Sequence, residues 1–366
     1  MKDVIHLEIG EPDFFTPVHV LDAADVAARQ GWTKYAPSLG DPELRAAVAE
    51  KVERENGIKA DPKTEVIITC GGMSAIASAV MALVDDGDEV MLPDPGWANY
   101  LGHVLMAGGN PVYVPLKEEK GFALDPETVR AKITPKTKLI IVNSPSNPTG
   151  GITPPDSLAE VTRICAGAGV YVISDEVYEK LVFEGRHYSP ASDPAVRDWV
   201  ITVNSFSKTY SMTGWRVGYA VAAQPVIAGM MRLQEQMIAC PSSVSQRAGL
   251  AALRGPQQCV TEMREQYRRR RDIVVEGFNR IPGFSCQKPP ATFYAFPSIK
   301  SFGIPSMEFA MTLLEKTGVA TVPGRAFGPS GEGYLRISFA TSEKSIEEGL
   351  RRIEKAVSSG ALESKR

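Results

Sequence analysis

Residues 138–175 read KLIIVNSPSNPTGGITPPDSLAEVTRICAGAGVYVISD, and this stretch decides the predicted fold. Its two ends, Lys138–Val142 and Val170–Ser174, are short apolar runs rich in β-branched residues. Such runs are typical of strands that are buried on both faces of a sheet. The intervening stretch Pro155–Ala168 has the apolar spacing of an amphipathic helix. Strand, helix and strand at this spacing predict a parallel pair joined by a crossover.

The same alternation extends on both sides of this unit, from about residue 34 to residue 222. A second helix is predicted at Met73–Val84, where small and apolar residues dominate. Further apolar runs predict three more strands, at Glu65–Thr69, Asp88–Leu92 and Trp199–Val203. The sequence therefore predicts an α/β fold with a parallel sheet covered by helices.

The pattern changes after about Gln224. A long helical region, Glu262–Phe278, contains the four consecutive arginines Arg268–Arg271. We interpret that run as a solvated helix face or a subunit contact rather than an anion-binding patch. Mixed strands and helices follow, up to a charged helix at Ser345–Val357. We therefore predict a large domain over residues 32–255 and a smaller α+β domain that combines residues 1–31 with 256–366.

The composition excludes several classes of protein. With 366 residues the chain is too long for one simple core, and its net charge of -3 does not favour a nucleic-acid partner. No run reaches the roughly 18 apolar residues that a membrane helix needs, and the start lacks an export signal. Five scattered cysteines without a CxxC pair favour a reducing cytoplasm, and the four histidines show no metal-ligand spacing. We predict no metal site, no nucleic-acid partner and no membrane partner.

Glycine and polar residues follow each predicted strand, at the edge where parallel sheets gather ligands. Gly71 and Gly72 open a helix whose free amides and dipole can hold a phosphate. Ser205 and Arg216, after the last predicted strand, can add a hydroxyl and a bidentate guanidinium. Each residue alone is more often a turn, a cap or a surface group. The hypothesis of a phosphate site depends on their meeting at one edge.

A second set at the same edge suits a planar ring. Trp97 offers a flat face, and Asp175 can pair with a protonated ring nitrogen. Tyr178 and Asn147 can hydrogen-bond a ring oxygen. Lys208 supplies the amine for a Schiff base with an aldehyde. Together the two sets predict a site for a planar, phosphorylated, electron-withdrawing cofactor.

Several motifs resemble one known family. The segment 205–218, SFSKTYSMTGWRVG, is similar to the lysine signature of the class I/II aminotransferases, which belong to the aspartate aminotransferase superfamily and to fold type I of the pyridoxal-phosphate enzymes. The resemblance extends over nearly the whole chain in the right order. The other family-like motifs are GEPDF (10–14), YAPSLG (35–40), PELR (42–45), NSPSNPTG (143–150), SDEVY (174–178) and RISFAT (336–341).

The resemblance implies pyridoxal 5′-phosphate as the cofactor and a mostly parallel seven-stranded sheet in the large domain. It implies that Lys208 forms the Schiff base and moves the substrate proton, with Asp175 and Tyr178 as the other catalytic residues. The cofactor-binding residues implied are Tyr35, Gly71, Gly72, Met73, Trp97, Asn147, Asp175, Tyr178, Ser205, Lys208 and Arg216. Met73 would contribute only its backbone amide.

The resemblance also implies how substrate and partner are bound. Arg336 would clamp the α-carboxylate of the substrate, helped by Gly10, Trp97 and Asn147. Tyr35 is similar to a tyrosine that reaches the phosphate from the partner subunit, which implies a homodimer. Family members carry about 25–35 residues ahead of the segment that matches 7–17, as an arm at the dimer interface. Almost nothing precedes that segment in the given sequence, so either the arm is absent or the stated start lies downstream of the true one, and the details of the dimer contacts stay open.

The predicted reaction is the transfer of an amino group between an L-amino acid and a 2-oxo acid by a ping-pong mechanism. The same site could instead serve a lyase or cyclase that acts on an amino acid by β- or γ-elimination. A more remote alternative is an aminotransferase-like ligand sensor. No second cation for a dicarboxylic substrate is evident apart from Arg325, a weak candidate. We therefore expect a substrate with a neutral or hydrophobic side chain.

Overall fold

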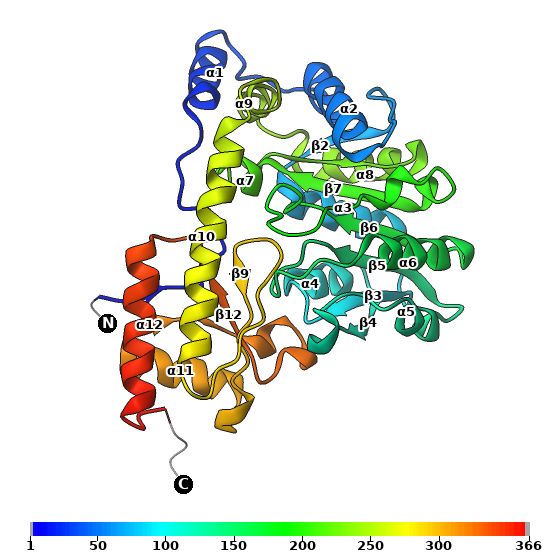
Figure 1. Ribbon diagram of the computed structural model, residues 1–366. Coiled ribbons are helices and arrows are strands. Elements are labelled where there is room, and N and C mark those ends of the chain that lie inside the picture. Colours follow the sequence, from blue (N-terminus) through cyan, green and yellow to red (C-terminus); the bar gives the residue numbers. More distant parts are fainter. Residues whose placement is uncertain (1–2, 363–366) are drawn as a thin grey trace.

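A seven-stranded sheet forms the centre of the larger part of the molecule (Figure 1), and the computed structural model describes residues 3–362. The strand order is β2-β8-β7-β6-β5-β3-β4. All pairs are parallel except those of β8, which is antiparallel to both neighbours. The strands are β2 (Val66–Thr69), β3 (Glu89–Asp94), β4 (Asn110–Pro115), β5 (Thr137–Asn143), β6 (Tyr171–Asp175), β7 (Val200–Ser205) and β8 (Gly218–Val221).

Helices cover both faces of this sheet because side chains alternate along each strand. In β5, Leu139 and Ile141 join one buried cluster, whereas Ile140 and Val142 join the other. The first cluster includes residues of α3 (Gly71–Leu83), α4 (Asn99–Met106) and α8 (Gln224–Ile238). The second includes residues of α2 (Pro42–Asn56), α5 (Pro126–Lys132), α6 (Pro155–Gly167) and α9 (Ser243–Arg254). The predicted mostly parallel α/β sheet is confirmed.

The smaller part is an α+β unit. Its three-stranded antiparallel sheet has the order β11-β12-β9, with β9 (Tyr294–Ala295), β11 (Val322–Pro323) and β12 (Leu335–Ser338). Its helices are α10 (Gln258–Arg280), α11 (Ser306–Thr317) and α12 (Glu343–Ser358). The long α10 runs from the larger part into the smaller one (Figure 1). This unit supports the predicted small α+β domain.

The N-terminal residues contact both parts. Strand β1 (Ile5–His6) pairs in parallel with β10 (Val319–Ala320) of the smaller part. Helix α1 (Val18–Arg29) packs against α9 of the larger part. The division of the chain at residues 31/32 and 255/256 stays a prediction, because the first 31 residues are shared between the two parts.

The arginine run on α10 is divided between solvent and interior. Arg268 and Arg269 are exposed, whereas Arg270 and Arg271 are buried. Arg270 pairs with Asp13 at 2.7 Å and Arg271 with Glu184 at 2.9 Å. The buried pair therefore ties α10 to the N-terminal segment and to the loop after β6. No helix among residues 3–362 is long and apolar enough to cross a bilayer.

Candidate active site

A cavity of about 380 Å³ lies where the carboxyl ends of the large-sheet strands face the smaller part. Strands, helix starts and the N-terminal segment all contribute to its wall, as expected at this edge of a parallel sheet. The residues that line it are Gly10, Glu11, Gly72, Met73, Ile76, Trp97, Tyr100, Asn143, Asn147, Asp175, Val177, Tyr178, Ser205, Ser207, Lys208, Thr213, Arg216, Tyr294 and Arg336.

Lys208 is placed by a short helix, α7 (Phe206–Thr209), that follows β7 directly. The Ser205 hydroxyl caps this helix by accepting a hydrogen bond from the Ser207 amide. The Lys208 ammonium donates to the backbone oxygen of Gly10 at 2.6 Å. Burial lowers the pKa of Lys208 to about 8, against the opposing charge of Glu11. The amine is therefore partly neutral, and hence nucleophilic, at physiological pH.

Asp175 ends β6 and is 3% exposed. Its Oδ2 accepts a hydrogen bond from the Tyr100 hydroxyl at 2.6 Å, and Oδ1 accepts one from the Val177 amide at 3.3 Å. Burial raises the pKa of Asp175 to about 6, and these two hydrogen bonds only partly counteract it. The carboxylate thus faces the cavity with neutral donors only, an environment that suits a cationic ligand.

A cradle for an anion lies at the start of α3. Gly71 has φ +78°, and a Cβ there would lie 2.6 Å from Nη2 of Arg216. Strand β8 passes just as closely, because a Cβ on Gly218 would lie 2.7 Å from the Gly72 nitrogen. Arg216 is fixed by a 2.7 Å hydrogen bond to the Thr213 oxygen. Helix amides, the Ser205 hydroxyl and a guanidinium therefore converge where a phosphate could bind.

Arg336 reaches the cavity from β12 of the smaller part. Its Nη1 donates to Oδ1 of Asn147 at 3.2 Å and its Nη2 to the Glu8 oxygen at 2.5 Å. The guanidinium packs between the rings of Tyr294 and Phe327, at 4.6 and 4.9 Å from their centroids. Its Nε is buried without a hydrogen-bond partner in the described chain. A rigid, partly unpaired guanidinium of this kind suits a carboxylate.

The sequence matches the model of the family "Aminotransferase class I and II" over residues 2–353. The chain belongs to this family. It is 43% identical over 360 residues to an aspartate aminotransferase of Pyrococcus abyssi, covering 98% of this chain and 92% of that protein. It is 42% identical over 360 residues to aromatic-amino-acid aminotransferase 2 of Thermococcus litoralis, with coverage of 98% and 92%.

The crystal structure of an aromatic aminotransferase from Pyrococcus horikoshii is similar to this chain with a TM-score of 0.97 and 42% identity. The likeness covers 99% of this chain and 97% of that one. The molecule is therefore an aminotransferase, which moves an amino group between an amino acid and a 2-oxo acid. The comparisons do not favour the elimination or ligand-sensor alternatives.

Most residues predicted for the site of this aminotransferase line the cavity, and three do not. Gly71 lies just behind the wall, where it allows Arg216 to approach the start of α3. Tyr35 is 89% exposed and lies outside the cavity of its own chain. Arg325, the weak candidate for a second cation, does not line the cavity either.

Six polar residues of the cavity wall were not predicted, namely Glu11, Tyr100, Asn143, Ser207, Thr213 and Tyr294. Three of them contact predicted residues of the ring site. Tyr100, one helical turn after Trp97, meets that ring edge to face at 5.3 Å and hydrogen-bonds Asp175. The hydroxyl of Tyr294 lies 3.1 Å from that of Tyr178. Asn143 donates to the backbone oxygen of Asp175 at 3.0 Å. Asn143 stood among the residues after a predicted strand, whereas no local signal marked the two tyrosines.

A further polar cluster lies on the other side of the segment that carries Asp175. One donor atom from each of Glu176, Glu179 and His187 lies within 4.8 Å of the others, although their spacing in the sequence suggested no metal site. The ammonium of Lys51 contacts Glu179 and supplies a cation there. We therefore assign these residues to a charge cluster.

Proposed function

We propose that this aminotransferase binds pyridoxal 5′-phosphate in the cavity, attached to the Lys208 amine. The observation that carries the proposal is the pairing of a partly buried amine, Lys208, with a buried carboxylate, Asp175, in one cavity. Asp175 has hydrogen bonds from neutral donors only, so a protonated ring nitrogen fits it. The cradle beside Gly71, with Arg216 next to it, fits the phosphate.

The bound cofactor would supply an aldehyde carbon and an electron-withdrawing ring. The amides of Gly72 and Met73, with Ser205 and Arg216, would hold its phosphate. Asp175 would keep a positive charge on the ring nitrogen. The remaining ring contacts would come from Trp97, Asn147 and Tyr178.

The protein's own groups account for substrate binding and proton transfer. The Arg336 guanidinium, held by Asn147 and the Glu8 oxygen, would orient the α-carboxylate of the amino acid. Lys208 Nζ would take the proton from the substrate Cα and later release it. A pKa of about 8 suits both steps, because the amine then exchanges protons readily near neutral pH.

We further propose that the substrate side chain is neutral or hydrophobic. The cations that line the cavity among the described residues are Lys208, Arg216 and Arg336, and each already has a partner or a role. Apolar groups, including Met73 and Ile76, line the wall at α3. Relatives carry the names of both aspartate and aromatic aminotransferases, so a panel of amino-acid donors with 2-oxoglutarate decides the point. A strong preference for aspartate would contradict this proposal.

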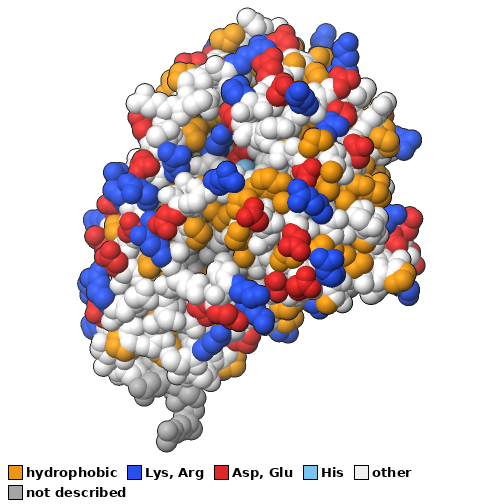
Figure 2. Space-filling view, turned by 45° about the vertical axis from the view of Figure 1, so that its right-hand side comes forward, with side chains coloured by type: hydrophobic (Ala, Val, Ile, Leu, Met, Phe, Trp, Pro, Cys, Tyr) orange, Lys and Arg blue, Asp and Glu red, His pale blue; other side chains and the backbone are white. Residues whose placement is uncertain are grey.

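A homodimer completes the proposal. Phe15 and Tyr35 are 93% and 89% exposed, which is unusual for large aromatic side chains. Hydrophobic side chains also gather on the face of the molecule that Figure 2 presents. A second copy of the chain would cover such surface and bring its Tyr35 to the phosphate. Sedimentation equilibrium tests the dimer, and Tyr35→Phe should then weaken cofactor binding without changing the cavity of its own chain.

The cysteines support a cytoplasmic location. All five are free thiols, and Cys165 and Cys286 are buried. Burial raises the pKa of both thiols to about 12, which makes them poor nucleophiles. We propose a reducing compartment on these grounds.

The decisive experiment replaces Lys208. Purified protein incubated with pyridoxal 5′-phosphate should turn yellow and exchange amino groups. Lys208→Ala should lose the attached chromophore and fall in activity by at least about a thousandfold, as expected when a covalent catalyst is removed. Lys136→Ala, at an exposed lysine remote from the cavity, is the matched control. A Lys208→Ala enzyme with normal turnover would refute the proposal.

A further inference from the structure

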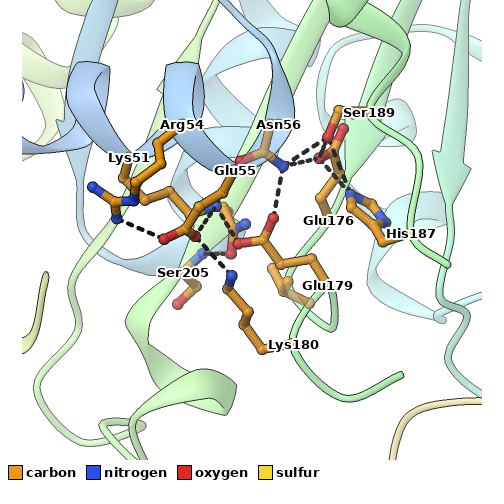
Figure 3. Close-up of polar contacts among 12 residues, drawn as sticks. Lys51, Arg54, Glu55, Asn56, Glu176, Glu179, Lys180, His187, Ser189 and Ser205 are labelled. Carbon is orange, nitrogen blue, oxygen red and sulfur yellow. Dashed lines mark hydrogen bonds and ion pairs between the residues drawn. The ribbon is translucent and has the colours of Figure 1, made fainter. Parts of the chain in front are cut away.

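The turn after β6 carries cavity residues and also contributes to a buried charge cluster, which Figure 3 shows in close-up. Asp175 and Tyr178 line the cavity. Glu176 and Glu179 contact the C-terminal end of α2 instead, and they are 0% and 9% exposed. In the sequence, Glu176 of this cluster therefore directly follows Asp175, the carboxylate that we assign to the cofactor ring.

Glu176 is held by several hydrogen bonds, of which one comes from a titratable group. Ser174 donates to its Oε1 at 2.8 Å, and Ser189 donates to its Oε2 at 2.6 Å. Nε2 of His187 lies 2.9 Å from the same Oε2, and the Asn56 amide lies at 3.4 Å. Within the described chain, His187 is the one hydrogen-bond partner of Glu176 that can carry a positive charge.

Glu179 already has a permanent cation. The ammonium of Lys51 contacts it, and the Asn56 amide donates to it at 2.7 Å. Burial would raise the pKa of Glu179, but Lys51 and the other nearby cations lower it to about 2, so the carboxyl is ionised. At the solvent-exposed rim, Glu55 pairs with Lys180 at 2.7 Å and with the exposed Arg54 at 2.6 Å, and the Lys51 ammonium lies 3.7 Å from it. Solvent screens these rim charges, so they weigh less than the buried ones.

The remaining charge balance depends on His187. Two buried carboxylates, Glu176 and Glu179, face Lys51 and His187, so the buried part of the cluster is neutral only when His187 is protonated. Burial would lower the pKa of His187, but the charge and hydrogen bond of Glu176, together with the charge of Glu179, outweigh that effect and the pKa is raised. An unbalanced buried charge is costly, which favours the protonated form.

We propose that His187 is a positioning residue of the active site, which in its protonated form neutralises Glu176 and thereby sets the charge next to Asp175. Removing this positive charge leaves the cluster with one net negative charge behind the cavity. That charge would stabilise cationic forms of the bound cofactor. A unit charge roughly 10–15 Å away, at an effective dielectric constant of about 20, shifts a titration midpoint by on the order of one pH unit.

The first test uses the cofactor-free protein and does not depend on the proposed cofactor. The chain has four histidines, so NMR of histidine-labelled protein yields few signals, and His187→Gln identifies one of them. The His187 signal should titrate above the usual midpoint of about 6.5. Glu176→Gln should lower that midpoint below the usual value. A His187 midpoint at or below about 6.5 would overturn the proposal.

The second test rests on the proposed function and reads the pH-dependent absorbance of the bound cofactor. His187→Gln keeps a hydrogen-bond donor but removes the charge, and it should raise the absorbance midpoint by about 0.5–1 pH unit. The double variant His187→Gln with Glu176→Gln has a neutral cluster again, so its midpoint should return to that of the wild type. A purely structural role predicts the opposite, with the double variant more disturbed than the single one.

These outcomes distinguish the two proposals. Wild-type protein without a chromophore would refute the cofactor, and the histidine titration would still decide the role of His187. A normal chromophore whose midpoint is the same in wild type and His187→Gln would refute the role of His187 alone. Circular dichroism of the two single variants and the double variant establishes that they are folded before either result is interpreted.

Discussion

At the scale of single residues, Asp175 shows how a binding site can lower the stability of the protein that carries it. Its pKa is raised to about 6 in the folded state, mainly by burial, against about 3.9 in an unfolded chain. The folded state therefore holds the proton more tightly. The resulting loss of stability is absent below about pH 4, grows as the pH rises, and is complete above about pH 6.

Asp175→Asn should consequently stabilise the cofactor-free protein at pH 7–8 by about 2–3 kcal/mol, because the amide carries no charge. At pH 4 the two proteins should unfold alike. Denaturant unfolding at several pH values measures this, with exposed Asp22→Asn as the matched control. Equal stability of Asp175→Asn and wild type at pH 8 would show that burying the ionised carboxylate does not destabilise the folded protein.

Burial raises the pKa of the Asp175 carboxyl, whereas the hydrogen bond from Tyr100 lowers it. The tyrosine hydroxyl stabilises the ionised form through the 2.6 Å hydrogen bond. Tyr100→Phe keeps the ring against Trp97 but removes this donor, so the cofactor-free protein should lose about 1–3 kcal/mol above pH 6 and less below pH 4. Tyr171→Phe, at a half-buried ring that packs on Trp199, is the control. A loss that is equal at all pH values would argue for packing rather than for the hydrogen bond.

At the scale of elements, the start of α3 depends on a backbone that only glycine adopts without strain. Gly71→Ala combines φ +78° with a Cβ 2.6 Å from the Arg216 guanidinium. We expect a loss of about 1–2 kcal/mol in stability and at least tenfold weaker cofactor binding, measured by fluorescence titration. Gly167→Ala, at the end of α6 where a Cβ meets nothing within 4 Å, should leave binding unchanged. Equal binding by both variants would contradict an anion cradle at α3.

The elements also show what local sequence can predict. All five strands expected from apolar runs are present, with ends displaced by at most two residues. The runs did not identify β4, an edge strand that begins with Asn110 and Pro111, or β8, which has only four residues and starts at Gly218. The resemblance to a family supplied the count of seven. Short or polar strands take their pairing from neighbours, which periodicity does not describe.

For the site, too, the sequence predicted residues with a local signal and missed those that only tertiary contacts bring to the cavity. The glycines, Asp175 and Lys208 lie at or just after the ends of strands, so the position of the sheet edge predicted them. Tyr294 and Arg336 come from the smaller part and meet the cavity only through tertiary contacts across more than 100 residues. For Arg336 the signal was the family motif, and Tyr294 had none. His187 joined its cluster without any local signal for the same reason.

At the scale of the whole molecule, the site is assembled from both parts, and a polar contact joins them beside it. Asp94, at the end of β3, accepts hydrogen bonds from the Ser330 amide at 2.9 and 3.1 Å and from its hydroxyl at 2.7 Å. The Gly96 amide donates to the Phe327 oxygen at 2.8 Å. The ring of Phe327 in turn packs on the guanidinium of Arg336. The loop before Trp97 thus holds the loop that supports the substrate-binding arginine.

Breaking this contact should loosen Arg336 without touching Lys208. Asp94→Ala should raise the KM for the amino-acid substrate by about three- to tenfold, equivalent to roughly 0.7–1.4 kcal/mol, and change kcat less, because the ground-state hold on the carboxylate is weakened. Ser330→Ala removes only the hydroxyl contact and should have a smaller effect in the same direction. Steady-state kinetics separates the two constants. A fall in kcat with KM unchanged would show instead that Asp94 supports the cofactor side of the cavity, through Trp97.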